Sequence, residues 1–175
     1  MHLFLDKLHP FCTYGEKKIK RTVMEHLEVC AYLSPKRVLC VEHAEKKVLM
    51  DMMLELICTS DKVVDPEELK KAVWSREKDM STGIGEGIAI PHARTKAAQD
   101  FVVAFALVKQ GMEFEAIDNR PVDIVFMIVA TEDQDKKYIK LLSRLMLRMK
   151  NTHLVDNLRG CGTAEELYNY LVESK

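Results

Sequence analysis

The stretch STGIGEGIAIPHART, from Ser81 to Thr95, holds the residues best suited to chemistry: a histidine preceded by three closely spaced glycines. His92 follows the apolar run GIAIP, which predicts a short strand that ends at the histidine. Neutral imidazole carries a lone pair, so a histidine held beside free backbone N–H groups can attack phosphorus. A partly buried, hydrogen-bonded histidine that only closes the strand fits the same spacing.

The glycine spacing excludes two kinds of nucleotide-binding loop. Gly83, Gly85 and Gly87 form G-x-G-x-G, whereas a dinucleotide fingerprint needs G-x-G-x-x-G between a strand and a helix. A Walker A loop would also require a Lys-Ser or Lys-Thr pair, which does not follow here. A loop that permits close backbone approach remains, and its N–H groups are candidates to neutralise phosphoryl oxygens beside His92.

The sequence on either side of this stretch predicts layers of helices and strands that would hold it in place. Asp65 is a suitable N-cap for a helix that begins at Pro66 and ends near Lys78. The apolar runs 101–108 and 122–130 predict strands buried on both faces. Other helices are expected over 22–33, 42–57 and 136–149, with a short one ending at residue 160 and a last one capped by Thr163.

The connection between the two long strands is too short for a helical crossover, so part of the sheet must be antiparallel. We therefore expect an α/β fold, with a mixed parallel and antiparallel central sheet flanked by helices on both sides. The length of 175 residues suits one domain, which we expect over 22–175, preceded by a leader of unknown role over 1–21.

Composition and charge argue against several classes of partner. A net charge of −1 gives no broad attraction to nucleic acid or to an anionic membrane, and no apolar run is long enough to span a bilayer. The five cysteines are an odd number without a C-x-x-C pair, so neither a zinc site nor a disulfide framework is expected. Free thiols indicate a reducing, cytoplasmic location.

Four segments occur together in an order that is typical of one family. They are SRE (75–77), STGIGEGIAIPHA (81–93), FEAIDNRPVDIVF (114–126) and AEELYNYL (164–171). On these segments the chain resembles the enzyme IIA family of the bacterial phosphotransferase system, fructose/mannitol type, and is most similar to its nitrogen-regulatory branch. The resemblance covers about residues 24–172.

The resemblance implies that His92 accepts a phosphoryl group from a phosphohistidine on a small histidine-containing phosphocarrier protein. It places Arg76, in the RE motif, where a guanidinium can bind two phosphoryl oxygens. Asp118 belongs to a DxxPV motif, which we interpret as a turn in the wall of the site. No cofactor and no metal are implied.

One position departs from the family pattern. Where the family usually has a second histidine, the predicted helix 136–149 has Tyr138, whose hydroxyl can donate a hydrogen bond but cannot carry imidazolium charge. This departure favours a free-standing regulator over the alternative of a sugar-transport component that passes phosphate to an enzyme IIB. A third interpretation is an interaction module that no longer transfers phosphate.

Overall fold

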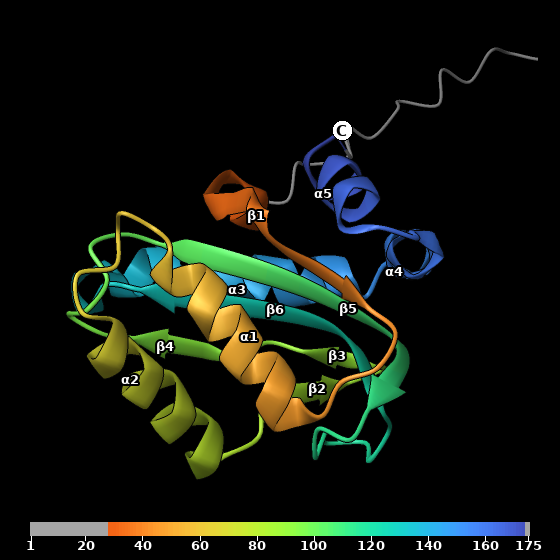
Figure 1. Cartoon of the computed structure of the whole chain (residues 1–175), viewed down its shortest axis with the longest axis horizontal. Helices are drawn as coiled ribbons and strands as arrows, with labels where there is room; N and C mark the ends of the chain where they lie inside the picture. The colour runs from red at the N-terminus through yellow and green to blue at the C-terminus, as the bar shows by residue number, and fades with distance from the viewer. Residues whose placement is uncertain (1–27, 174–175) are drawn as a thin grey trace, which may run out of the picture.

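The computed structural model describes residues 28–173, and its centre is a pair of long antiparallel strands. These are β5 (Val102–Met112) and β6 (Val122–Ala130), paired from Val102 opposite Val129 to Met112 opposite Val122. The predicted strand 122–130 coincides with β6, which is buried except at the half-buried Asp123, and β5 is buried from Val102 to Val108. Continuous apolarity arises because helices cover both faces of the pair (Figure 1).

The rest of the sheet forms on the two outer edges of this pair. β1 (Leu33–Val41) lies parallel to β5 on one side. On the other side β3 (Ile88–Ala89) and β4 (His92–Arg94) both lie parallel to β6, one after the other along it. β2 (Gly83–Gly85) pairs antiparallel with β3 and completes a six-stranded mixed sheet within the described residues.

Helices cover the sheet on both faces, as the sequence predicts (Figure 1). On one face α1 (Lys46–Cys58) and α2 (Pro66–Asp79) enclose a core that includes Leu49, Met53 and Phe114. On the other face lie α3 (Asp135–Met149), α4 (Thr152–Gly160) and α5 (Ala164–Glu173), around a core with Phe105 and Phe126. Short 3₁₀ segments occupy Glu28–Tyr32 and Glu132–Gln134.

The predicted helix over 22–33 is wrong in its described part. Residues 28–32 form a single 3₁₀ segment, and Leu33 already begins β1. This strand was missed because Pro35, Lys36 and Arg37 interrupt its apolar pattern, and proline and charge are tolerated at a sheet edge. The predicted leader, 1–21, lies outside the described residues.

Two of the predicted helix starts can be compared with their hydrogen bonds. The Asp65 carboxylate accepts from the Glu68 N–H at 3.0 Å, which confirms the cap of α2. At α5 the Thr163 hydroxyl accepts from the Glu166 N–H at 3.1 Å, as expected for a cap. The Glu166 carboxylate bonds the N–H of Gly162 instead of that of Thr163, so the reciprocal half of the capping box is displaced by one residue.

Candidate functional site

The site forms at the edge of the sheet where β4 lies between α2 and α3. Pro91 separates β3 from β4, and its carbonyl accepts from the Ile128 N–H at 2.9 Å, so the chain stays attached to β6 across the break. His92 therefore begins a short strand, whereas the sequence predicted that it ends one. Side chains alternate along a strand, so His92 and Arg94 share one face while Ala93 points into the core beneath α1 and α2.

The imidazole of His92 has two different nitrogens. Nδ1 lies 2.6 Å from the carbonyl oxygen of Ile90, and because a carbonyl only accepts, Nδ1 must carry the proton. The lone pair of the neutral ring is then on Nε2. Burial lowers the pKa of His92 below its ordinary value, the bond to Ile90 opposes that shift, and Arg76 reinforces it. The ring is thus held neutral and nucleophilic.

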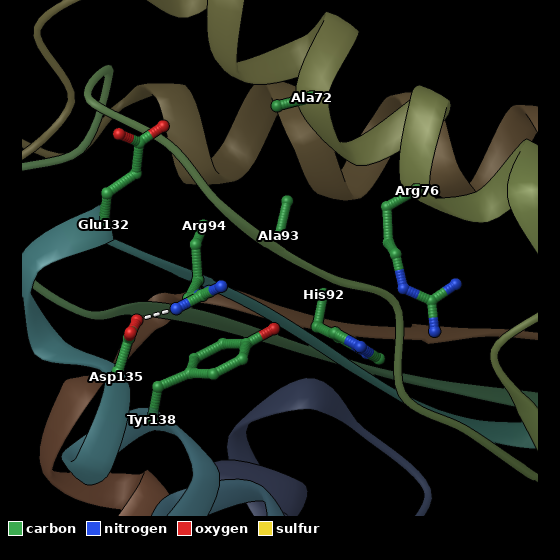
Figure 2. A pocket seen from close by; sticks show the side chains of 8 residues that line it. All are labelled: Ala72, Arg76, His92, Ala93, Arg94, Glu132, Asp135 and Tyr138. Carbon is green, nitrogen blue, oxygen red and sulfur yellow. Dashed lines mark ion pairs between the residues drawn. The ribbon is translucent and has the colours of Figure 1, made fainter.

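Two adjoining cavities share His92 and Arg76. We call the first, of about 580 Å³, the polar cavity (Figure 2). It is lined by Ala72, Arg76, His92, Ala93, Arg94, Glu132, Asp135 and Tyr138. The second, of about 610 Å³, we call the apolar cavity, since its lining includes Ile84, Ile117, Leu142 and Met146.

Arg76 reaches both cavities from the last turn of α2. Its Nη1 donates to the Met80 carbonyl at 2.8 Å, beyond the end of the helix, and this bond helps to direct the guanidinium along the sheet edge. A guanidinium has five N–H donors, so others are available to an anion beside His92. The predicted pairing of His92 with Arg76 is therefore possible in this arrangement.

Tyr138 projects from the first turns of α3 into the polar cavity. It is 7% exposed, and its ring centroid lies 6.1 Å from that of His92 and 6.5 Å from that of Phe101. Burial raises the pKa of Tyr138 to about 12, although Arg94 and Arg76 act in the opposite direction. The side chain in this slot is thus uncharged across the physiological range.

The sequence interpretation missed Arg94 and Asp135. Arg94 forms an ion pair with Asp135, and its Cζ lies 5.6 Å from the centroid of the Tyr138 ring (Figure 2). A signal for Arg94 was available, because residues i and i+2 of a strand share a face and H-x-R therefore places both side chains together. Asp135 had no such signal, since only the packing of α3 brings it to β4.

The three glycines of the predicted phosphate loop are separated by the fold. Gly83 lines the apolar cavity with His92 and approaches Ala116 closely, because a Cβ on Gly83 would lie 2.7 Å from the Ala116 Cα. Gly85 and Gly87 lie at the turn between β2 and β3 and line neither cavity described above. Their positive φ angles of 93° and 82° give them a structural role in this turn.

Asp118 fixes that same turn from outside. Its carboxylate accepts from the Glu86 N–H at 2.8 Å and from the Arg120 N–H at 3.1 Å, while the Asn119 N–H bonds the Ala116 carbonyl. Asp118 thus forms a turn of its own and ties it to the β2–β3 hairpin. The predicted turn exists, and Ile117 within it lines the apolar cavity.

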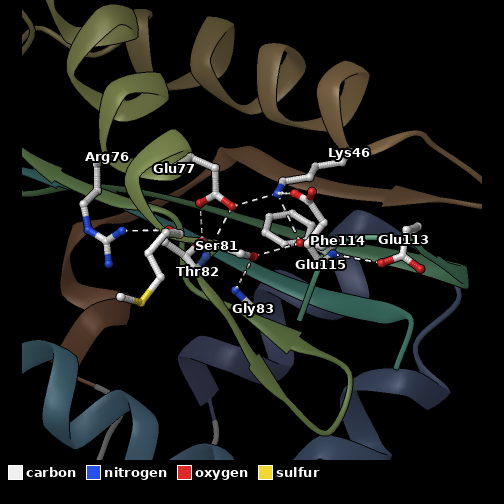
Figure 3. Close-up of polar contacts among 10 residues, drawn as sticks. Lys46, Arg76, Glu77, Ser81, Thr82, Gly83, Glu113, Phe114 and Glu115 are labelled. Carbon is white, nitrogen blue, oxygen red and sulfur yellow. Dashed lines mark hydrogen bonds and ion pairs between the residues drawn. The ribbon is translucent and has the colours of Figure 1, made fainter. Parts of the chain in front are cut away.

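A buried ion pair supports the loop that leads to His92 (Figure 3). Glu77, whose side chain is 3% exposed, lies 2.9 Å from Lys46 of α1. The same carboxylate accepts from the Thr82 N–H at 3.2 Å and from its hydroxyl at 2.6 Å. The Thr82 carbonyl in turn accepts from the Ile90 N–H, so the network extends to the peptide that holds His92.

The described part of the chain has neither a cluster of metal-ligating side chains nor a helix fit to cross a membrane. Within residues 28–173 no three His, Cys, Asp or Glu side chains gather as a metal ion would need. None of the helices in that range has the length and apolar character that crossing a bilayer would require.

Comparison with known protein families shows the family to which this chain belongs. The profile described as "Phosphoenolpyruvate-dependent sugar phosphotransferase system, EIIA 2" matches residues 31–174. The chain belongs to this enzyme IIA family. The resemblance stated from the sequence is therefore confirmed, and with it a general role in phosphoryl transfer.

Enzyme IIA relatives include both regulatory and sugar-specific proteins. A nitrogen regulatory protein of Pseudomonas aeruginosa is 31% identical over 142 residues, which cover 81% of this chain and 92% of that protein. A fructose-specific EIIABC component of Bacillus subtilis is 41% identical over 105 residues, which cover 60% of this chain and 16% of that much longer protein. The relatives thus include the predicted nitrogen-regulatory branch.

Solved structures confirm the predicted α/β sandwich. Nitrogen regulatory protein IIA-Ntr from Neisseria meningitidis superposes with a TM-score of 0.73 at 26% identity, covering 82% of this chain and 98% of that one. Mannitol enzyme IIA of Escherichia coli, solved in complex with phosphorylated enzyme IIB, has the same fold, with a TM-score of 0.67 at 21% identity and coverage of 81% and 97%.

Proposed function

We propose that this enzyme IIA protein accepts a phosphoryl group on Nε2 of His92 from a phosphohistidine of a small histidine-containing phosphocarrier protein. We further propose that its phosphorylation state controls binding to a regulatory target in the cytoplasm. The bond from His92 Nδ1–H to the Ile90 carbonyl is the observation that carries the proposal, because it leaves the lone pair on Nε2.

The proposed transfer is an exchange of one nitrogen–phosphorus bond for another. The lone pair of His92 Nε2 forms the new bond to phosphorus, while the bond to the donor's ring nitrogen breaks and its electron pair returns to that nitrogen. The proton on Nδ1 stays in place, and the Ile90 carbonyl stabilises the positive charge that develops in the ring. Arg76 neutralises the equatorial oxygens in the same step.

The surface around His92 supports a protein as the donor. Ile84, Ile117 and Met146 line the apolar cavity beside the imidazole, and Ile117 is 82% exposed. Exposed apolar side chains clustered next to a reactive group are typical of a protein-binding surface. A macromolecular phosphoryl donor such as the phosphocarrier fits this surface.

A sugar-transport role is the second candidate. Relatives named as fructose-specific components and the mannitol IIA–IIB complex support an enzyme IIB as the phosphoryl acceptor. The uncharged Tyr138 and the relatives named as nitrogen regulatory proteins favour the regulatory role. An interaction module without phosphoryl transfer would need His92 only as a structural residue.

Transfer of a radioactive phosphoryl group tests the proposal. The chain would be incubated with phosphocarrier protein that has been phosphorylated from labelled phosphoenolpyruvate, beside a His92→Gln control. Acid-labile label on the wild type and none on His92→Gln is the expected result. An unlabelled wild type would support the interaction module, and equal label on both proteins would reject His92. Onward movement of label to an added sugar-specific enzyme IIB would favour transport.

A further inference from the structure

Phosphorylation of His92 would upset the charge balance of the polar cavity. Four charged side chains line it, and they are balanced: Arg76 and Arg94 against Glu132 and Asp135. A phosphoryl group brings a charge of about −1.5 to −2 and three acceptor oxygens. Tyr138 cannot offset that charge, because a phenol is never cationic and can offer only a hydrogen bond. Arg76 can supply one positive charge with its free N–H groups, and the second cation of the cavity, Arg94, must leave its carboxylate partner to supply another.

Arg94 is placed for such a change. It lies on the same face of β4 as His92, two residues further on and therefore about 6.5 Å away along the strand. Its guanidinium lies over the Tyr138 ring, which also contacts His92, so the aromatic ring lies against both side chains. An aromatic ring can hold a guanidinium by stacking and cation–π attraction while its N–H groups exchange partners.

The present partner of Arg94 is weakly held. The ion pair with Asp135 joins side chains that are 41% and 63% exposed, and ion pairs in contact with water contribute little. Asp135 is also the first residue of α3, where the helix dipole stabilises a carboxylate without a cation. Release of Arg94 would therefore cost little at the Asp135 end.

We propose that Arg94 is a second phosphoryl-binding residue, held by Asp135 while His92 is free and transferred to the phosphoryl oxygens once His92 carries them. The proposal rests on phosphorylation of His92 as proposed above. Arg94 supplies the positive charge that Tyr138 cannot, and Asp135 acts as a positioning residue that competes with the phosphoryl group for the guanidinium. After transfer of Arg94, the unpaired Asp135 carboxylate changes the surface charge at the start of α3.

Two substitutions that break the same ion pair separate this role from a structural one. Arg94→Gln removes the cation, whereas Asp135→Asn removes its competitor and leaves Arg94 available. A purely structural pair predicts that both variants shift phosphoryl transfer in the same direction. A phosphoryl-binding Arg94 predicts opposite directions.

The measurement is the equilibrium distribution of radioactive label between the phosphocarrier and this chain, for each variant. We expect Arg94→Gln to lower the equilibrium constant for transfer of label to this chain about tenfold, as for the loss of one charge-assisted hydrogen bond. We expect Asp135→Asn to raise the same constant about threefold. Arg94→Lys should lie between Arg94→Gln and the wild type, because it keeps the charge without the fork. Lys96→Gln, which removes an 88% exposed cation close to Glu132, serves as the matched control and should leave the constant unchanged.

Thermal unfolding of each variant checks that the fold is retained, which the exposure of both side chains favours. Suppose that the wild type is labelled on His92, but that Arg94→Gln and Asp135→Asn change the equilibrium constant in the same direction or leave it unchanged. Arg94 then does not bind the phosphoryl group, and the proposed function stands. If the wild type takes no label, both the proposed function and this inference fall.

Discussion

At the scale of single residues, the reactivity of His92 depends on the different surroundings of its two ring nitrogens. The carbonyl of Ile90 fixes the proton on Nδ1, and burial disfavours a second proton on Nε2. Arg76 adds to that effect by repulsion, while Glu77 opposes it from further along α2. The guanidinium that adds to the effect of burial on the free imidazole would attract the phosphoryl group after transfer.

We predict that His92 titrates below about 6.5, the ordinary histidine value. NMR titration of the imidazole resonance that is lost in His92→Gln would measure the midpoint, and a midpoint above that value would contradict the prediction. At a pH between the pKa of His92 in the native chain and its higher pKa in the unfolded chain, the unfolded chain binds a proton that the native chain does not. The free energy of unfolding should therefore fall as the pH is lowered through this range, while phosphoryl acceptance is lost only below the native pKa.

Tyr138 gives a second prediction at this scale. Tyr138→His would place a group that can carry positive charge near neutral pH where a neutral ring now lies. We expect the rate of label turnover to rise about threefold or more, because a charged donor stabilises the transferring phosphoryl group better than a phenol. Tyr138→Phe is the size-matched control, and its rate should not exceed that of the wild type because it removes the phenol donor. Equal rates in all three proteins would show that the slot has no influence on transfer.

At the scale of elements, the site depends on the joint between the end of α2 and the loop before β2. The Glu77 carboxylate binds Lys46 and both hydrogen-bond donors of Thr82, and so connects α1, α2 and the chain that leads to His92 (Figure 3). Arg76 is the neighbour of Glu77 in the same helical turn. A disturbance of this joint should therefore reach both Arg76 and His92.

We predict that Glu77→Ala lowers the free energy of unfolding by about 2 kcal/mol or more, because two Thr82 donors lose their buried acceptor, while Lys46 keeps its ion pair with the exposed Glu115. Denaturant unfolding would measure the change. Lys47→Ala, on α1 next to Lys46, is the control, since the ion pair of Lys47 with Asp51 is exposed and should contribute below about 1 kcal/mol. A similar small loss in both variants would mean that the buried network is not stabilising the joint.

Elements differ in how well the sequence predicts them. The strand over 122–130 and the helix from Pro66 were predictable because complete burial and a proline after an N-cap leave clear patterns. β1 was not, because an edge strand with a register shift after Leu33 has no regular alternation. β2, β3 and β4 are two or three residues long, too short for periodicity to define their bounds.

At the scale of the whole molecule, the candidate site exists only where the sheet edge meets both helical layers. β4 provides His92, α2 on one side provides Arg76, and α3 on the other provides Tyr138 (Figures 1 and 2). The resemblance of the sequence motifs to the enzyme IIA family was enough to predict that these three residues share one site, although their contacts in space were not known. The pairing of Asp135 with Arg94 could not be found in that way, because it depends on how α3 packs against the edge.

The surface around the site gives a prediction at this scale. Ile117→Ser should slow labelling by the phosphorylated carrier about threefold to tenfold, since it removes an exposed apolar contact beside His92. Val64→Ser, at a 54% exposed position that lines neither cavity, is the matched control. Both variants should unfold at the wild-type temperature. If both label at the wild-type rate, the donor docks elsewhere.

The identity of the phosphorylated atom tests the proposed attack by His92 Nε2 most directly. Phosphorus–nitrogen NMR of the ¹⁵N-labelled protein after incubation with phosphorylated carrier distinguishes the two ring nitrogens of a phosphohistidine. The hydrogen bond between His92 Nδ1 and Ile90 predicts a single phosphohistidine with phosphorus on Nε2, absent from His92→Gln. Phosphorus on Nδ1, on another residue, or on neither protein would contradict the account.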